Sequence, residues 1–247
     1  MSKFQAVLVL IVIMLILIWP HYKYMNIYHK NLPAVSVNEI VPKLRTGDIV
    51  MMKYETPCFY NGPNGSNTSI YFGKAIADSI QYYSQGHFTH AGVIMVVNNV
   101  PYVFHLTDDP NKDEYTGKYV SGTPALCSTE FLQSYRGNIY LLKHSGNVNV
   151  DTMKVIKNIY SRNVMLEGTI SGCVWNNGLK FGKNSDNKYM CTDFVEDVLS
   201  QLGILSKPTR NQDIVGLIKR LSETNYYNIN PTIIKTGWYE NIYDKFM

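Results

Sequence analysis

The sequence has few cysteines, no closely spaced cysteine pair and no long run of charge of one sign. Its four cysteines, among 247 residues, show no CxxC motif and no zinc-ribbon spacing, so a disulfide framework is not indicated. The net charge of +4 is scattered, without an arginine-rich stripe, which argues against a nucleic-acid partner. Hydrophobic residues make up 45% and charged residues 17%, as in an ordinary globular protein. The length allows one domain and a membrane segment.

One long apolar run, residues 4–19 (FQAVLVLIVIMLILIW), lies near the N-terminus. Gln5 is its one polar residue, and the run covers about 24 Å, somewhat short of a hydrocarbon layer of about 30 Å. Lys3 before the run, and aromatic and basic residues after it, are typical of the ends of an anchor. No small-residue cleavage site follows Trp19, which favours an uncleaved membrane anchor over the alternative, a signal peptide. The orientation stays open.

The remaining pattern predicts an α+β domain, with strands in the middle of the chain and helices around them. We expect a central antiparallel sheet packed on helices. A loop rich in glycine, asparagine and proline is expected at 55–69, and residues 108–135 and the tail from Asn228 show little regular pattern. The expected division is a transmembrane anchor (1–22), a juxtamembrane linker (23–43) and a folded domain (44–247). Strands are expected in 44–53 (after a turn at Gly47-Asp48), 91–97, 102–107 and 138–143, and helices at 74–83, 130–134, 150–162 and 213–221.

A further helix is expected in YMCTDFVEDVLSQLGI (189–204), with Cys191 near its start and a stop at Gly203. A helix N-terminus carries partial positive charge and unpaired N–H groups, so this position favours a thiolate. The alternative is a small apolar side chain that packs. The spacing predicts a buried stripe of Val195, Val198, Leu199 and Leu202, with Asp193, Glu196, Asp197 and Gln201 on other faces.

Two histidines lie on a predicted hairpin. Its turn is Asn98-Asn99, a pair that tolerates the positive φ of tight turns. A two-residue turn pairs His105 with Gly92, so His90 and His105 lie diagonally on one face with Cα atoms roughly 7 to 8 Å apart. Gly92 leaves the space between them clear. A register slip of one residue would separate them onto opposite faces.

A cysteine at a helix start and two histidines on one strand face are the groups of a thiol catalytic site. Cys191 would be the nucleophile, His90 the general base and His105 the group that orients His90. The N–H groups of the helix start would stabilise an oxyanion, with the Tyr189 hydroxyl as a helper. Zinc binding is an alternative for the same three residues, but a fourth ligand and closely spaced pairs are missing.

Four segments in this order, RTGDIVMM (45–52), THAGVIMVV (89–97), YVFHLT (102–107) and YMCTDFVEDVL (189–199), resemble the circularly permuted papain-like thiol hydrolases. That superfamily includes permuted relatives of the NlpC-type cell-wall peptidases, lecithin:retinol acyltransferase-like enzymes and members in large DNA viruses. The resemblance implies a permuted papain-like domain, with Cys191 as nucleophile, His90 as catalytic histidine and His105 at the third polar position. Asp48 matches a frequent structural residue at the start of the domain, where it caps a turn.

These patterns lead to the hypothesis of a membrane-anchored cysteine hydrolase or acyltransferase without a cofactor or metal. A bilayer contacted through residues 4–19 brings the site near acyl-bearing lipids or lipidated peptides, so an amide, ester or thioester bond is the expected target. A peptidase acting on cell-wall or viral peptides is the competing view. The other alternative is an inactive membrane-anchored structural or interaction protein of the same fold, for example a virion membrane component.

Overall fold

The computed structural model describes Gln5 and residues 33–54, 88, 90–107, 111–135, 137–166, 188–209, 214–227 and 231–235. Within these residues, one sheet has seven strands. They are β1 (Ala34–Ser36), β2 (Ile49–Tyr54), β3 (His90–Val97), β4 (Val100–Thr107), β7 (Thr123–Ser128), β8 (Gly137–Leu142) and β11 (Thr232–Lys235). Their spatial order is β1-β11-β8-β2-β3-β4-β7, and neighbours are antiparallel except β1 and β11.

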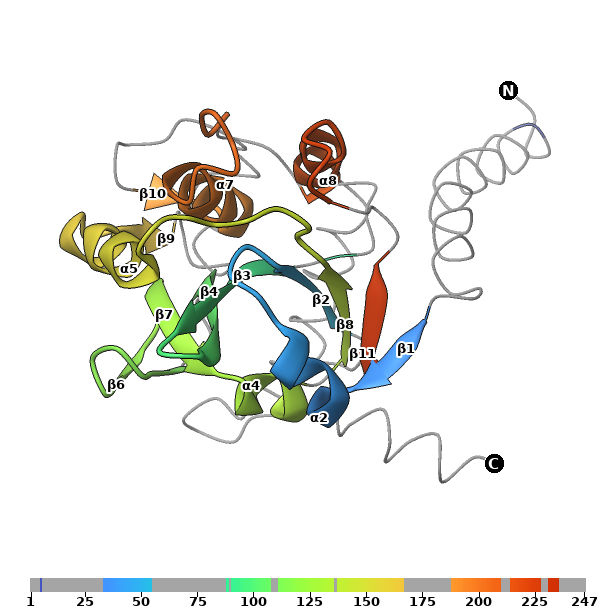
Figure 1. Ribbon diagram of the computed structural model, residues 1–247, viewed down its shortest axis with the longest axis horizontal. Coiled ribbons are helices and arrows are strands. Elements are labelled where there is room, and N and C mark those ends of the chain that lie inside the picture. The colour runs from blue at the N-terminus through green and yellow to red at the C-terminus, as the bar shows by residue number, and fades with distance from the viewer. Residues whose placement is uncertain are drawn as a thin grey trace.

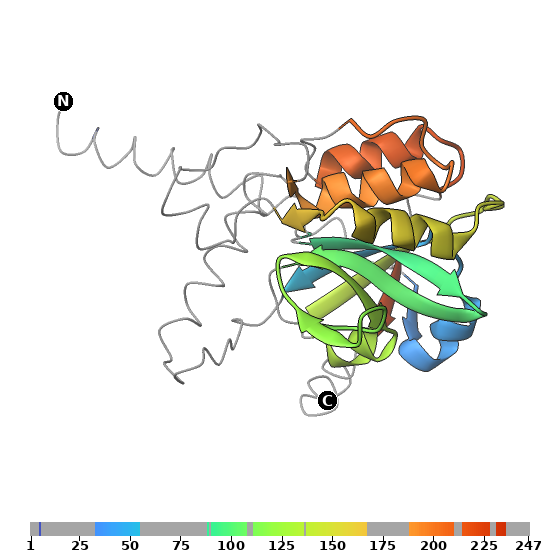
Figure 2. The ribbon, with the colours of Figure 1, turned by 90° about the vertical axis from the view of Figure 1, so that its left-hand side faces the viewer.

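Helices cover both faces of this sheet (Figure 1). One face, called the α7 face below, carries α5 (Thr152–Ser161), α7 (Cys191–Gln201) and α8 (Ile214–Ser222). The opposite face, called the α4 face, carries α2 (Val37–Ile40), the 3₁₀ turn η1 (Val41–Lys43) and α4 (Glu130–Ser134), and Figure 2 shows the sheet between the two layers. Two short pairs complete the described elements: β5 (Asn111–Asp113) with β6 (Lys118–Val120), and β9 (Met165–Leu166) with β10 (Lys188–Tyr189). The prediction of a mixed α+β domain is confirmed.

Each face of the sheet carries its own hydrophobic core because side chains alternate along a strand. In β3, Ala91 and Val93 belong to the core of the α7 face, whereas Ile94 belongs to the core of the α4 face. The same alternation directs His90 and Gly92 to the α4 face.

The β3–β4 hairpin forms in the predicted register. Val97 pairs with Val100, and Gly92 pairs with His105. Both turn residues have positive φ, 50° at Asn98 and 64° at Asn99, which asparagine tolerates better than most side chains. The predicted hairpin is therefore confirmed to the residue.

Helix α7 begins at Cys191, as expected, and the Asp193 carboxylate accepts the backbone N–H of Met190 ahead of it at 3.1 Å. The predicted apolar stripe is buried, but so are the acidic side chains assigned to other faces. Glu196 accepts hydrogen bonds from Arg220 (2.9 Å) and from the Thr209 backbone (2.7 Å). Neighbouring segments thus cover α7 on all sides, and their cations and N–H groups make burial of the carboxylates tolerable.

Other expected elements match closely. The structure has β2 after a turn at Gly47, whose φ is +93°, and it has α4 at its predicted bounds. Strand β8 and helices α5 and α8 lie within one or two residues of the predicted ranges.

Strands β7 and β11 were not expected from the sequence. β7 lies within the segment interpreted as loop-rich, and it contains Pro124, which argues against a central strand. It is the edge strand next to β4 in the observed order, where proline is accommodated. β11 lies in the unassigned tail and pairs with β8 and β1.

Residues 34–43, assigned to the linker, take part in the described fold. β1 pairs with β11, and Val37 and Ile40 of α2 belong to the core of the α4 face. Because apolar side chains of this segment are buried under the sheet, its removal would expose that core.

The expected anchor at residues 4–19, apart from Gln5, lies outside the described residues, as do the loop at 55–69 and the helix at 74–83. Within the described part of the chain, no helix has the length and apolar character needed to cross a membrane.

Candidate active site

His90 and His105 are joined by a hydrogen bond on the α4 face. His90 is the first residue of β3, and its Nε2 lies 2.9 Å from Nδ1 of His105 on β4. The two ring centroids are 5.2 Å apart. The expectation that the hairpin register brings these rings together on one face is confirmed, because a slip of one residue would have put the sheet between them.

Gly92 makes room for this contact. A Cβ atom on Gly92 would lie 3.0 Å from Cβ of His105 and 3.3 Å from the carbonyl oxygen of Phe104. Few real Cβ contacts are that close, so any side chain here would push against the base of the His105 side chain. The predicted role of Gly92, to leave space beside the histidines, agrees with this geometry.

His105 is buried in an apolar setting. It is 1% exposed, and its ring centroid lies 4.9 Å from that of Phe131 on α4. Burial, and then the neighbouring His90, hold the pKa of His105 well below its ordinary value. His105 is therefore neutral near pH 7, with one ring nitrogen that donates a hydrogen bond and one that accepts.

Cys127, on β7, contacts the second nitrogen of His105. Its Sγ lies 3.2 Å from His105 Nε2. Burial, followed by the charges of Asp113 and Glu114, raises the pKa of Cys127 to about 12, so it is a thiol at neutral pH. The role of Cys127 was not predicted, because its strand was not expected from the sequence. Its place on the face of His105 depends on the pairing of β7 with β4, for which residues 123–128 carry no alternating apolar pattern.

Cys191 is the first residue of α7 and is partly exposed. The backbone N–H of Ala91, the residue after His90, lowers its pKa, as does the N–H of Thr192. The sulfur therefore lies beside the start of β3. Burial has the larger effect and raises the pKa of Cys191 to about 11. The N–H groups at this helix start thus lower the pKa of Cys191, as expected, but desolvation outweighs them.

The candidate residues approach from opposite sides of the sheet. α7 packs with Ala91 and Val93 on the α7 face, whereas the imidazoles of His90 and His105 belong to the α4 face. They converge at the beginning of β3, where His90 is the first strand residue. The contact between the Cys191 thiol and the His90 imidazole stays a prediction.

Tyr189 and Asp48 have other partners. Tyr189 is buried on β10 and hydrogen-bonds Arg162, which also pairs with Asp197. The backbone carbonyl of Asp48 accepts the N–H of Ile94 on β3. Ile94 is four residues from His90, which corresponds to about 13 Å along the strand.

The contacts of Asp48 are those of a turn-capping residue. Its carboxylate accepts the backbone N–H of Arg45 (2.9 Å) and of His144 (2.8 Å), and Lys143 Nζ at 2.6 Å. It is 0% exposed. The geometry agrees with the structural role that the sequence favoured for Asp48, and it separates this residue from the histidines.

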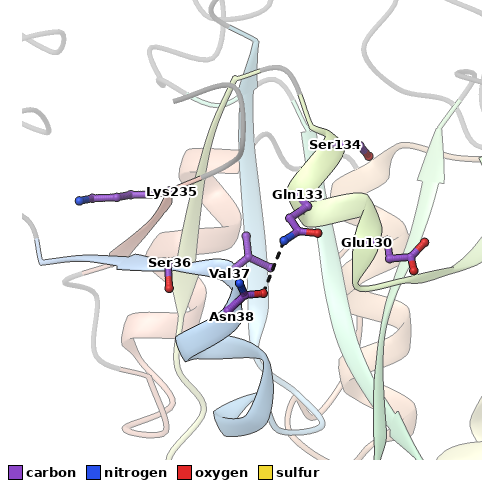
Figure 3. Close-up of a pocket in the computed structure, with 7 residues that line it drawn as sticks. All are labelled: Ser36, Val37, Asn38, Glu130, Gln133, Ser134 and Lys235. Carbon is purple, nitrogen blue, oxygen red and sulfur yellow. Dashed lines mark hydrogen bonds between the residues drawn. The ribbon is translucent and has the colours of Figure 1, made fainter. Parts of the chain in front are cut away.

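A surface pocket of about 490 Å³ lies between α2, α4 and the end of β11 (Figure 3). Gln133 Nε2 donates to Asn38 Oδ1 across it at 3.5 Å. The pocket uses the side of α4 that carries Glu130 and Gln133, whereas Phe131 of the same helix contacts His105. The pocket and the histidine pair are therefore separate features. Among the described residues, no group of three or more His, Cys, Asp or Glu side chains is arranged to hold a metal ion.

No protein-family model matches this chain, and no curated protein does. A solved structure, metalloprotein yiiX from Escherichia coli O157:H7, is similar over 79% of this chain and 92% of its own chain, at 15% sequence identity and a TM-score of 0.35. A likeness at that score supports no statement about fold or chemistry.

Proposed function

We propose that this chain is a membrane-anchored, cysteine-dependent hydrolase or acyltransferase with a permuted papain-like domain. Cys191 is the nucleophile, His90 the general base and His105 the group that orients His90. The observation that carries the proposal is the 2.9 Å hydrogen bond between the two imidazoles at the start of β3, the part of the strand where the Ala91 N–H lowers the pKa of the Cys191 thiol. Thiol catalysis needs an imidazole held through one nitrogen and within reach of the thiol. His90 is held in this way, and its reach to the Cys191 thiol is part of the proposal.

In this reaction His90 takes the proton of the Cys191 thiol as the sulfur attacks a carbonyl carbon. The tetrahedral intermediate collapses to a thioester on Cys191, and His90 returns the proton to the departing amine, alcohol or thiol. Water, or an acceptor hydroxyl or amine, then attacks the thioester and gives up a proton through His90, which restores the Cys191 thiol. The partial positive charge at the start of α7 would stabilise the oxyanion.

The proposed substrate is an amide, ester or thioester in an acyl-bearing lipid or lipidated peptide. The support for this substrate class is the apolar run at 4–19, which we propose as a single N-terminal anchor in a host or virion membrane. An anchored enzyme meets substrates dissolved in the same bilayer at high local concentration.

Limited alkylation tests the reaction class. The full chain in mild detergent is treated with substoichiometric iodoacetamide near neutral pH, and peptide mapping compares Cys191 with Cys58, Cys127 and Cys173. We expect preferential labelling of Cys191, lost in His90→Ala and kept in the control His144→Gln, whose buried imidazole lies near Asp48. Labelling of Cys191 that does not depend on His90 would remove His90 from the mechanism.

One observation favours a second candidate, an inactive structural or interaction protein of the same fold. Burial raises the pKa of Cys191 to about 11, so the thiol is protonated near pH 7 and cannot attack a carbonyl unless a base takes its proton. A Cys191 that is unreactive in the folded protein would support this candidate. Turnover of acyl or peptide substrates that is lost in Cys191→Ser would exclude it.

A further inference from the structure

The His90–His105 pair continues to a third side chain, Cys127. Nδ1 of His105 faces His90 at 2.9 Å, and Nε2 faces the Cys127 sulfur at 3.2 Å. Cys127 is 3% exposed. It pairs in register with Val103 on β4, two residues from His105 and on the same face of the sheet. The three side chains form a line across β3, β4 and β7, which we call the relay.

A neutral His105 has one ring hydrogen for two contacts, so the two bonds of the relay depend on each other. If the hydrogen is on Nε2, His105 donates to Cys127 and accepts the Nε2–H of His90, which leaves the lone pair of His90 on Nδ1. If the hydrogen is on Nδ1, both bonds reverse, and the hydrogen of His90 moves to Nδ1. The tautomer of His105 therefore decides which nitrogen of His90 can act as a base.

The electrostatic surroundings of Cys127 favour the first arrangement. The buried carboxylate of Asp113 accepts the backbone N–H of Leu126, the residue before Cys127, at 2.9 Å, and the hydroxyl of Tyr160 at 2.6 Å. These bonds hold a negative charge near the Cys127 end of the relay. Negative potential at that end attracts the hydrogen of His105 to Nε2, the nearer nitrogen.

We propose that Cys127 is a positioning residue: its sulfur accepts the Nε2–H of His105 and so selects the tautomers in which His90 presents a basic Nδ1. The sulfur takes no part in covalent chemistry. The catalytic consequence rests on the proposed function, but the tautomers themselves can be measured without substrate.

The test is long-range ¹H–¹⁵N NMR of the full chain in detergent with ¹⁵N-histidine, near pH 7.5. The His105 signals are identified by their loss in His105→Gln. We expect a protonated Nε2 and an unprotonated Nδ1 on His105 in the unmodified chain and in Cys127→Ser, which retains an acceptor. In Cys127→Ala, and in Cys127→Val, which fills the space without an acceptor, both tautomers should be populated.

Val103→Ala is the matched control, because it removes bulk directly opposite Cys127 on the same face and leaves both relay bonds. Its histidine signals should be those of the unmodified chain. If Nδ1 of His105 carries the hydrogen in the unmodified chain, or if neither Cys127→Ala nor Cys127→Val changes the tautomer, the inference is wrong.

The alkylation rate of Cys191 separates this inference from the proposed function. We expect it to fall about fivefold in Cys127→Val, the effect of about one ordinary hydrogen bond, and to stay unchanged in Val103→Ala. A Cys191 that is unreactive in the unmodified chain, with the expected tautomers present, would overturn the proposed function and leave the relay established. A reactive Cys191 with unchanged tautomers in the Cys127 variants would overturn the relay and leave the function.

Discussion

Gly92→Ala tests whether the close approach at Gly92 matters to the histidine pair. The φ of Gly92 is not positive, so alanine meets no backbone strain, and its lower unfolded-state entropy would by itself stabilise the fold by about 0.4–1 kcal/mol. The new Cβ would, however, lie 3.0 Å from Cβ of His105 and 3.3 Å from a carbonyl oxygen. Overpacking of this kind costs about 1–3 kcal/mol, or about 2 kcal/mol at the midpoint, so the expected net loss after a stabilisation of about 0.7 kcal/mol is about 1.3 kcal/mol.

For a chain of this size, that loss lowers Tm by about 3–5 °C, which differential scanning fluorimetry measures easily. Displacement of His105 should also weaken its bond to His90, so alkylation of Cys191 should slow by about fivefold. A double-mutant cycle with His105→Gly is the control, because that change removes the Cβ that alanine would meet. A Tm for Gly92→Ala equal to or above that of the unmodified chain would refute the packing argument.

Three further predictions concern buried ionisable groups. Asp48→Asn should destabilise the fold by about 2–3 kcal/mol in urea unfolding, because it removes the charge that pairs with Lys143; an unchanged midpoint would contradict the capping role. Because the pKa of His105 is lowered on folding, the unfolded chain binds a proton more readily, so stability should be intact above about pH 6.5 and fall as the pH drops below it. In His105→Gln, stability should fall less steeply below about pH 6.5 than in the unmodified chain. The same pH dependence in both proteins would show that other groups cause it. Arg220→Met leaves the fully buried Glu196 without its cation and should cost about 3–5 kcal/mol, whereas Lys219→Met, on the exposed face of the same helix, should change stability by less than about 0.5 kcal/mol.

Features that depend on residues close to one another in the sequence could be predicted. The Asn98-Asn99 turn needs positive φ at two consecutive positions, and a two-residue turn leaves one register, so the pairing of Gly92 with His105 follows from the sequence. The start of α7 at Cys191 follows likewise from the apolar spacing and the polar residues before it.

Features that depend on distant segments were not predictable. The buried state of Glu196 depends on Arg220 and Thr209, which reach it from beyond the end of α7. β7 becomes a strand because β4 pairs with it, although Pro124 argues against one. The raised pKa of Cys191 has the same origin, because desolvation depends on all the segments that pack around the thiol and outweighs the local effect of a helix start.

Local sequence was enough to predict the hairpin, its register and the helix that begins at Cys191, because turn dihedrals and side-chain periodicity are local properties. It also determined that His90 and His105 share one face. The tertiary structure was needed to show that Cys127 completes the relay, that Asp48 lies about 13 Å from His90 along the strand, and that Cys191 approaches from the α7 face. Each of these depends on which strands become neighbours and on how much water is excluded between them, and no local pattern encodes either quantity.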